Sequence, residues 1–253
     1  MPSWFRQSAR PEAVIAPPAV APDLRLYAIG DVHGRPDLLR RLHGMIADDA
    51  RGAPQSRKRV VYLGDYIDRG PDSKGVIDIL VAEPLEGFEA IHLEGNHEHA
   101  LLGFLVDIRF APMWLGNGGA ATLASYGVPV PDPGRPAELL ETQERLLAAL
   151  PQAHRAFLRS LELSHSAGDY FFVHAGVRPG RPLDRQDSED LLWIRDPFLG
   201  SQADFGKVVV HGHTISRAPE ICDNRIGIDT GAFASGHLTC LVLEGDSRTL
   251  LQT

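Results

Sequence analysis

The sequence predicts an α/β protein in which two packed β-sheets are flanked by helices. Three features of the 253-residue chain support this fold class. Apolar runs typical of buried strands alternate with segments of helical periodicity over residues 24–106. Strand-like runs return after residue 161, and short polar motifs follow the ends of most runs. Polar groups at strand ends are the usual way in which an α/β fold gathers distant loops into one site.

The N-terminal half alternates between strand and helix patterns. Residues 24–29 form a short apolar run that ends at Gly30, which is typical of a buried strand. Pro36 suits the first turn of a helix, and apolar residues recur behind it at helical spacing. Further strands are predicted at 59–63 and 88–93, and further helices at about 72–81 and 96–106. This rhythm indicates a largely parallel sheet covered by helices.

The middle of the chain has a different pattern. Residues 114–161 contain a glycine-rich stretch, a proline-rich loop at 127–136 and helical patterns at 138–150 and 152–161. We interpret this segment as a helical insertion over the sheet, because strands resume on both sides of it. The remaining strands are predicted at 170–173, 207–210, 224–228, 237–243 and 249–252. We therefore expect one domain at 23–253, preceded by a flexible, proline-rich arm at 1–22.

Composition excludes several classes of protein. The formal net charge of −8 argues against a broad nucleic-acid-binding surface, which favours excess Lys and Arg. No run approaches the roughly 18 apolar residues of a membrane span, and prolines interrupt the stretch where a signal peptide would have its apolar core. Cys222 and Cys240 have no disulfide or metal-ligand spacing. These features predict a cytoplasmic protein with no nucleic-acid or membrane partner.

Six polar motifs recur in a fixed order along the chain. They are GDVHG at 30–34, GDYIDRG at 64–70, GNHE at 95–98, HAG at 174–176, HGHT at 211–214 and DTG at 229–231. Two divalent cations about 3.5–4 Å apart promote phosphate ester hydrolysis, because they neutralise the phosphate oxygens and lower the pKa of a shared water. The motifs supply carboxylate, amide and imidazole groups for such a pair: Asp31, His33, Asp65, Asn96, His174 and His213. This mixture favours Mn, with Fe or Zn as alternatives, over Ca.

The ordered motifs resemble those of the phosphoprotein phosphatase branch of the calcineurin-like metallophosphoesterases. Within that branch, residues 26–243 look most like the bacterial and phage type, such as lambda phosphatase. The resemblance implies a sandwich of two mixed β-sheets flanked by helices. It also implies that Asp31 and His33 hold the first metal and that Asp65 bridges the two ions. Asn96, His174 and His213 would hold the second metal. His213 is preferred to His211 because the family's ligand lies in a Gly-His-Thr context. His211 would then be structural.

The same resemblance implies roles for four more residues. His97 matches the general acid and Asp68 its orienting carboxylate. An imidazolium beside a carboxylate stays protonated near neutral pH and can donate its proton to a leaving oxygen. Arg69 and Arg195 match the two phosphate-binding arginines, and a guanidinium fork fits two phosphoryl oxygens at once.

Three functions remain open at this stage. The leading hypothesis is hydrolysis of phosphomonoesters, as by a Ser/Thr protein phosphatase, through attack of a metal-bridging hydroxide. The near alternative is hydrolysis of a dinucleoside polyphosphate such as diadenosine tetraphosphate. A catalytically silent metal-binding scaffold is the alternative from another class. Such a scaffold would be expected to lack Asp68, His97 or a metal ligand, and none of these residues is lost. Glu94 stands where many family members have arginine, which places a negative charge near the site and favours phosphomonoesters. The partner is thus a phosphoprotein or a phosphorylated small molecule, and the oligomeric state is left open.

Overall fold

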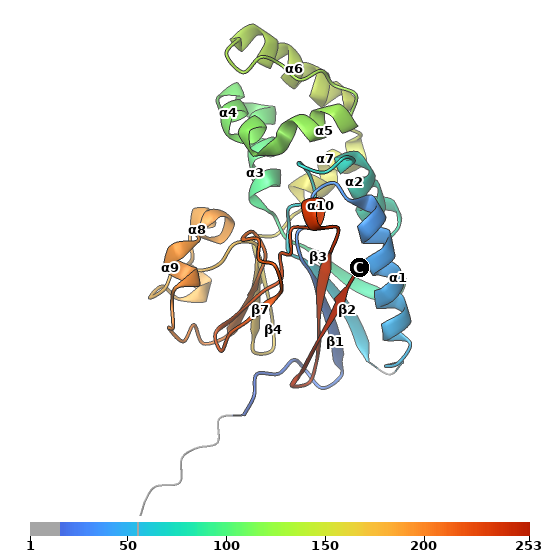
Figure 1. Cartoon of the computed structure of the whole chain (residues 1–253), viewed down its shortest axis with the longest axis vertical. Coiled ribbons are helices and arrows are strands. Elements are labelled where there is room, and N and C mark those ends of the chain that lie inside the picture. The colour runs from blue at the N-terminus through green and yellow to red at the C-terminus, as the bar shows by residue number, and fades with distance from the viewer. Residues whose placement is uncertain (1–15, 55) are drawn as a thin grey trace, which may run out of the picture.

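The computed structural model describes residues 16–54 and 56–253. Two five-stranded sheets lie face to face at its centre, with helices on their outer sides (Figure 1). Both sheets contain parallel and antiparallel neighbours. The α/β prediction, with two mixed sheets flanked by helices, is therefore confirmed.

The first sheet has the order β10-β9-β1-β2-β3. Strands β1, β2 and β3 are parallel, whereas β9 and β10 form an antiparallel hairpin on the other side of β1. The bounds are β1 Leu24–Ile29, β2 Arg57–Tyr62, β3 Phe88–His92, β9 Thr239–Glu244 and β10 Ser247–Gln252. Because β1, β2 and β3 run in one direction, the loops that follow them emerge at the same edge of the sheet.

The second sheet has the order β4-β5-β6-β8-β7, and its three central strands are parallel. The bounds are β4 Ser164–Ala167, β5 Tyr170–Val173, β6 Val208–His211, β7 Glu220–Ile221 and β8 Arg225–Gly227. The polar edge strand β4 was not predicted. It contains only one buried residue, Ala167, and it is held by antiparallel pairing with the fully buried β5.

Some helices cover the outer faces of the two sheets, and others lie beyond the edge of the first sheet. Their bounds are α1 Pro36–Ala50, α2 Ser73–Ala82, α3 Asn96–Val106, α4 Ala111–Trp114, α5 Ala120–Ser125, α6 Pro136–Ala149, α7 Gln152–Arg159, α8 Ser188–Trp193, α9 Asp196–Leu199 and α10 Ala232–Ser235. Short turns of 3-10 or π geometry complete them at Ile108–Phe110, Leu115–Gly119 and Leu183–Arg185. Pro36 begins α1 as predicted, and the Asp72 carboxylate caps α2 by accepting the Gly75 N–H at 2.7 Å.

Successive side chains of a strand point to opposite faces of the sheet, which creates separate apolar layers on the two faces. Leu24, Leu26 and Ala28 of β1 face the core between the two sheets, whereas Tyr27 and Ile29 face the core under the helices. In β5, Tyr170 and Phe172 point into the core between the sheets. Their neighbours Phe171 and Val173 pack outward, in the cluster that also holds residues of α8 and α9. A strand that is buried on both faces has a continuous apolar sequence. This is why these strands could be predicted from the sequence.

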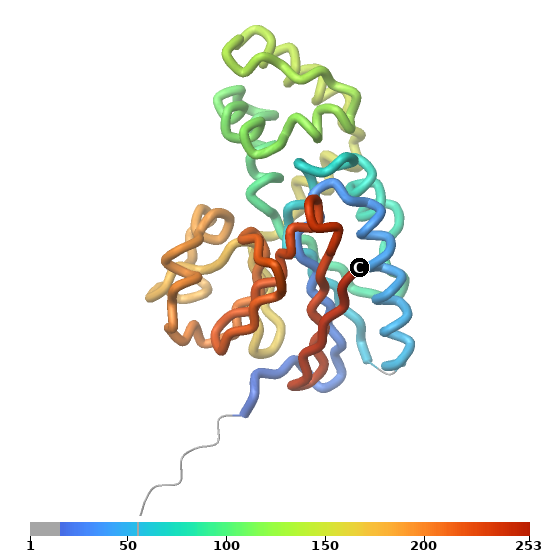
Figure 2. The backbone as a smooth tube through the Cα atoms, viewed as in Figure 1, coloured from blue at the N-terminus to red at the C-terminus, as the bar shows by residue number. Residues whose placement is uncertain are grey.

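The predicted insertion at 114–161 is helical in the structure. Helices α4, α5 and α6 lie beyond the edge at which β1, β2 and β3 end, at the top of Figure 2. Helix α7 returns to the first sheet, where the Phe157 ring lies 5.7 Å from Tyr66 and 5.0 Å from His92. We refer to α4–α6 with their connecting turns as the helical cap.

Part of the proline-rich arm is attached to the sheets. The Val20 N–H donates to Gly245, the Ala19 N–H donates to the Asp169 carboxylate at 3.0 Å, and Val20 is buried. Residues 19 and 20 of the predicted arm thus contact the sheets, and its residues 1–15 lie outside the described residues. None of the helices in the described ranges is both long and apolar enough to cross a membrane.

Candidate metal centre

The loops after five strands converge on one buried cluster. Asp31 and His33 follow β1, Asp65 follows β2, and Asn96 begins α3 just after β3. His174 follows β5 of the second sheet, and His213 follows β6. These six predicted metal ligands are all buried. The structure therefore brings them together from both sheets, at the edge where the parallel strands of each sheet end.

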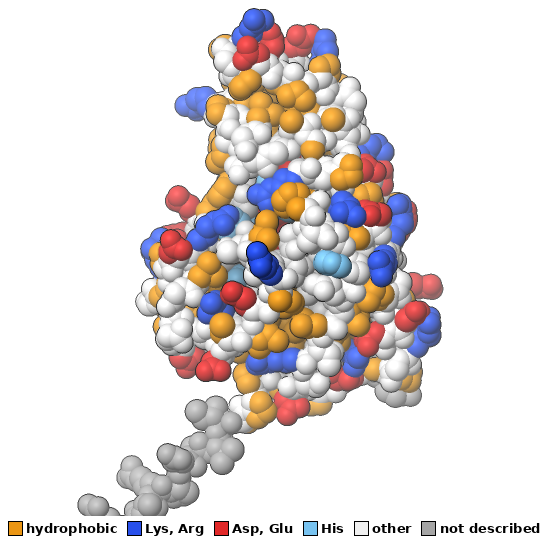
Figure 3. Space-filling view, in the orientation of Figure 1, with side chains coloured by type: hydrophobic (Ala, Val, Ile, Leu, Met, Phe, Trp, Pro, Cys, Tyr) orange, Lys and Arg blue, Asp and Glu red, His pale blue; other side chains and the backbone are white. Residues whose placement is uncertain are grey.

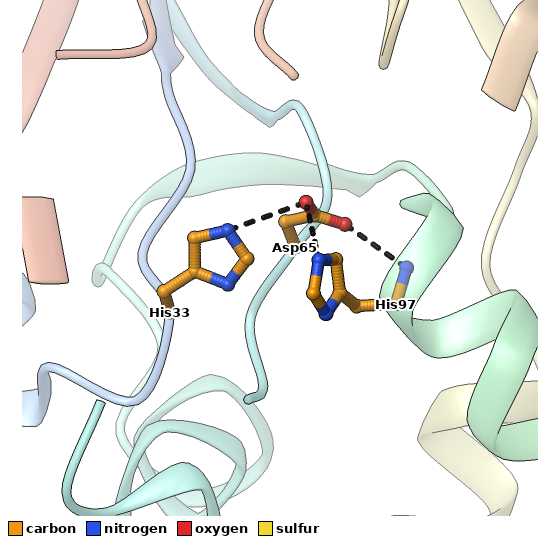
Figure 4. A group of neighbouring side chains, drawn as sticks. All are labelled: His33, Asp65 and His97. Atoms are coloured by element: carbon orange, nitrogen blue, oxygen red, sulfur yellow. Dashed lines mark hydrogen bonds and ion pairs between the residues drawn. The ribbon is translucent and has the colours of Figure 1, made fainter. Parts of the chain in front are cut away.

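Asp65 lies at the centre of this cluster. One carboxylate oxygen is 3.4 Å from His33 Nε2 and 3.7 Å from His97 Nε2, and the other is 3.4 Å from His174 Nε2. Figure 4 shows the imidazoles of His33 and His97 directed at the same carboxylate. Two groups with metal-ligand spacing share Asp65: one with His33 and His97, the other with His174 and His213. A carboxylate shared in this way fits the predicted bridging position.

The second group is completed by an amide oxygen. Asn96 Oδ1 lies 2.9 Å from His174 Nε2 and 2.9 Å from His213 Nδ1. The other ring nitrogen of His174 is held by the Leu63 carbonyl at 2.9 Å, which orients the imidazole from behind. One oxygen and two ring nitrogens thus point at a common position beside Asp65.

Asp31 has an oxygen free for a cation. Its Oδ2 accepts the His213 N–H at 3.0 Å, but its buried Oδ1 has no hydrogen-bond partner among the described residues. A Cβ on Gly212 would lie 2.0 Å from that Oδ1, so only glycine permits this approach. Carboxylate oxygens, an amide oxygen and imidazoles form a donor set that suits divalent ions such as Mn, Fe or Zn. The residues present therefore fit a pair of such cations.

Backbone strain is concentrated at the same place. Among the described residues, five that are not glycine have positive φ: His33, Asp65, Asp68, Arg69 and His213. All five were predicted as site residues from the motifs. Positive φ is unfavourable for residues with a Cβ, and such conformations persist at functional sites where the surrounding structure imposes them.

Burial controls the protonation of the candidate ligands. It lowers the pKa of His33 to about 3 and also lowers the pKa of His174 and of His213. These imidazoles are consequently neutral at physiological pH. A neutral imidazole is the form that binds metal, so the centre does not need to release protons from these residues before binding.

His97 and Asp68 form a buried pair next to the cluster. His97 Nδ1 lies 2.7 Å from Asp68 Oδ2, and both side chains are fully buried. Burial opposes the charged imidazolium, but the Asp65 charge and the hydrogen bond to Asp68 outweigh it and raise the pKa of His97. The Nε2 of His97 has no partner among the described residues and faces Asp65. This geometry leaves one ring nitrogen available to a bound substrate.

The helical cap holds Asp68 in place. Trp114 Nε1 donates to the Asp68 carboxylate at 3.1 Å, and the Thr122 hydroxyl donates to it at 2.5 Å. The Asp68 N–H in turn donates to the Ser73 and Thr122 hydroxyls. Sequence reasoning did not identify these partners, because nothing near Asp68 in sequence indicates that residues about 50 positions away contact it.

The two predicted phosphate-binding arginines occupy different surroundings. Arg69 Nη1 lies 3.0 Å from His33 Nε2, and its guanidinium lies 5.3 Å from the centre of the Phe233 ring. Arg195 is exposed just before α9, and in the described part of the chain its side chain forms no ion pair or hydrogen bond. Its charge acts on both His174 and His213, where it lowers their pKa. Both guanidinium groups are thus close to the cluster.

Sequence reasoning also missed the function of Glu98, the last residue of the GNHE motif. Its buried carboxylate accepts the N–H groups of Asp65, Tyr66, Ile67 and Gly95 at 2.8–3.2 Å. Glu98 therefore fixes the backbone of the loop that carries Asp65.

Two histidines considered from the sequence, His211 and His237, are not among the candidate ligands, whereas Asp229 neighbours Asp31, where burial and the Asp229 charge raise the pKa of the Asp31 carboxyl. His211 is buried against Phe198, with ring centres 5.0 Å apart, and His237 contacts the Thr253 carbonyl at 2.9 Å. Asp229 accepts the Gly231 N–H at 2.9 Å, as expected for a residue that stabilises a turn. Its second oxygen is nevertheless buried without a partner among the described residues, and burial raises the pKa of Asp229 to about 6.

Strand-end ligands, a shared carboxylate and a buried acid pair on two mixed sheets are the features of a two-metal phosphoesterase. The profile of the calcineurin-like phosphoesterase family matches residues 24–238, and the chain belongs to that family. It is therefore a metallophosphoesterase, a hydrolase that acts on phosphoester bonds at a dinuclear metal centre.

Two relatives of the chain have names that refer to dinucleoside tetraphosphates. The chain is 26% identical over 235 residues to the asymmetrical bis(5'-nucleosyl)-tetraphosphatase PrpE of Bacillus mycoides (strain KBAB4), covering 84% of this chain and 88% of that protein. A symmetrical bis(5'-nucleosyl)-tetraphosphatase of Acidovorax sp. (strain JS42) is 31% identical over 160 residues, but these cover only 62% of this chain and 45% of that protein.

A solved structure supports the fold. The crystal structure of a protein proposed to be a diadenosine tetraphosphatase superposes with a TM-score of 0.62 and 21% identity. The superposition covers 94% of this chain and 98% of the other. At this identity the likeness supports the architecture and not the substrate.

Proposed function

We propose that the protein hydrolyses dinucleoside tetraphosphates into two unequal nucleotides. One observation carries this proposal: the match to the asymmetrical tetraphosphatase extends over 84% of this chain and 88% of that relative. The shared region is longer than the motifs and includes the segment that forms the helical cap. The match to the symmetrical enzyme favours equal cleavage instead, but it covers less than half of that protein and therefore carries less weight.

The candidate site suits attack on a phosphoanhydride chain. Bound divalent ions supply positive charge for the phosphate oxygens and a water of lowered pKa. Asp31, His33, Asp65, Asn96, His174 and His213 are the residues that we propose hold these ions. Arg69 and Arg195 would each present a guanidinium fork to the non-bridging oxygens and so orient the phosphorus for attack.

His97 is proposed to donate a proton to the leaving oxygen. Asp68 Oδ2 accepts from Nδ1 at 2.7 Å, which directs Nε2 toward the cluster and stabilises the protonated ring. The leaving oxygen in a tetraphosphate belongs to another phosphate, whose second pKa is about 6. It therefore requires less protonation by a general acid than a serine alkoxide does. The same pair also serves phosphomonoesters.

The comparisons support dinucleotide hydrolysis better than the protein phosphatase hypothesis. The argument from Glu94 for phosphomonoesters is also weakened by its contacts. The Glu94 carboxylate lies 3.1 Å from His99 Nδ1, and this hydrogen bond raises the pKa of His99. When His99 is protonated, its positive charge offsets that of Glu94, so Glu94 then repels a polyphosphate less than an isolated carboxylate would. A silent scaffold is not favoured, since every residue of the proposed machinery is present.

A comparison of substrates tests the proposal. Purified protein in Mn is assayed with diadenosine tetraphosphate and with a phosphoserine peptide at equal ionic strength, and the products are separated by chromatography. We expect a higher kcat/KM for the dinucleotide and equal amounts of AMP and ATP. ADP as the single product would show symmetrical cleavage. A clear preference for the peptide would instead support the protein phosphatase hypothesis.

A further inference from the structure

A partly apolar pocket lies beside the metal centre and is used by none of the roles described above. It has a volume of about 390 Å³ and opens between helix α3, the start of the cap and helix α8. In Figure 3 the outline of the molecule is indented on the left, between the helical cap and the part that carries α8. Its lining consists of His99, Phe110, Met113, Ser188, Glu189, Leu192 and Trp193. This volume falls within the roughly 300–1,000 Å³ range of small-molecule sites.

Two of the lining residues, Trp193 and Met113, are close in sequence or in space to residues of the candidate site. The Trp193 ring lies 6.4 Å from the ring of His213, a predicted ligand, and Arg195 follows two residues later. On the opposite wall, Met113 precedes Trp114, whose indole donates to Asp68. A molecule in this pocket therefore lies against two residues, Trp193 and Met113, whose neighbours His213 and Trp114 belong to the candidate site.

The lining is unsuited to a phosphate and suited to an aromatic ring. Neither lysine nor arginine contributes to it, and the carboxylate of Glu189 would repel an anion. Phe110 and Trp193 offer ring faces, while Met113 and Leu192 offer apolar contact. Aromatic side chains bind nucleobases by stacking, largely independently of base identity. The Glu189 carboxylate and Ser188 hydroxyl, which form no side-chain hydrogen bonds within the described residues, can accept from an exocyclic amino group.

We propose that this pocket binds one nucleobase of the substrate, with Phe110 and Trp193 as stacking surfaces and Glu189 as the acceptor for its amino group. The proposal rests on the dinucleotide function inferred above. Arg195, two residues after Trp193 and near enough to His174 and His213 to lower their pKa, can then contact the phosphate nearest to the bound nucleoside. The helical cap thus contributes Met113 of α4 to the pocket, and Phe110 comes from the 3-10 turn just before the cap.

Ligand affinity tests the proposal without requiring turnover. AMP and ribose 5-phosphate carry the same phosphate and sugar and differ in the base. Their Kd values for the Mn-loaded protein are measured by titration calorimetry. We expect AMP to bind roughly tenfold more tightly than ribose 5-phosphate, which is the gain typical of one stacked base.

Two variants locate this selectivity. Phe110→Leu removes the ring and keeps apolar volume, and Glu189→Ala alters an exposed side chain that the fold does not need. Each should reduce the ratio of the two Kd values at least threefold. Phe205→Leu changes a phenylalanine of similar partial burial on the outer side of the second sheet, and it should leave the ratio unchanged. Using the ratio cancels any effect of the lost Glu189 charge on phosphate binding.

The outcomes separate this proposal from the one on which it rests. A ratio near one in the wild-type protein, or a ratio unaffected by both variants, would overturn the pocket assignment even if diadenosine tetraphosphate is cleaved. Selective AMP binding that depends on Phe110 and Glu189 would support the pocket even if a phosphopeptide proves the better substrate. In that case the dinucleotide function fails and nucleotide binding remains.

Discussion

Replacing His97 by asparagine isolates the contribution of the proposed proton donor. The His97 side chain is fully buried, so no bulk water takes its place, and the shorter asparagine does not extend to the position of Nε2. Asp68 keeps its hydrogen bonds from Trp114 and Thr122, so the pocket around it should remain intact. Loss of general acid catalysis then costs about 100- to 10,000-fold in kcat, or about 3–5 kcal/mol in the activation barrier.

The size of this loss should depend on the leaving group. A phosphoserine peptide releases a strongly basic alkoxide and should show the full effect. p-Nitrophenyl phosphate and diadenosine tetraphosphate release weakly basic oxygens and should show a smaller one. Steady-state kinetics of the Mn-loaded His97→Asn variant with the three substrates measure this. His165→Asn, which changes a histidine in β4 that contacts Arg59 and none of the predicted site residues, serves as the matched control and should retain full activity.

A double variant tests whether His97 and Asp68 act as a unit. If Asp68 operates through His97, the Asp68→Asn/His97→Asn protein should lose less than about tenfold beyond the slower single variant, because coupled residues are not additive. The reasoning fails if the His97→Asn loss is equal for all three leaving groups. It also fails if the variant binds one metal ion fewer, since His97 would then be a ligand and not an acid.

Three further changes test other parts of the site and fold. Asp65→Asn should release bound metal together with activity, because one residue would serve both ions; metal analysis that still finds two tightly bound ions would exclude a bridging role. Arg195→Ala should raise the inhibition constant for inorganic phosphate several-fold without changing metal content, whereas an unchanged constant places Arg195 outside the site. Burial lowers the pKa of His43, which lies 2.9 Å from the Tyr62 hydroxyl, to about 4, so the fold favours the neutral ring. The stabilisation of the fold by the neutral His43 ring is complete above pH ~6.5 and is lost as the pH falls toward 4. Urea unfolding should show that wild type loses about 3 kcal/mol more than His43→Gln between pH 7 and pH 4, and equal losses would contradict this.

Much of the site was predictable because most predicted ligands closely follow strands with buried apolar residues. Asp31 and Asp65 sit at the ends of apolar runs, and parallel neighbours must deliver such residues to one edge. The second sheet could not be ordered from the sequence. The pairing of β6 with β8 instead of β7 depends on tertiary contacts, and the polar β4 is a strand only because β5 pairs with it.

The supporting residues were harder to identify than the ligands. Thr122 and Trp114 contact Asp68 only because the helical cap folds back over the loop, and no local pattern records that return. Glu98 was visible within a motif, but its purpose depends on four amides that converge from neighbouring loops. The substrate preference is the feature that the sequence predicts least well: the motifs specify a metal centre and not a leaving group, and the comparisons favour the alternative hypothesis, dinucleotide hydrolysis, over the leading one.

The positions of the metal ions test the central claim most directly. Anomalous diffraction from crystals of the Mn-loaded protein should show two peaks about 3.5–4 Å apart, both within bonding distance of the Asp65 carboxylate. The first should also contact Asp31 and His33, and the second should contact Asn96, His174 and His213. His97 should remain unbound to either ion. A single peak, or a peak ligated by His97 Nε2, would contradict the two-metal site with a separate acid.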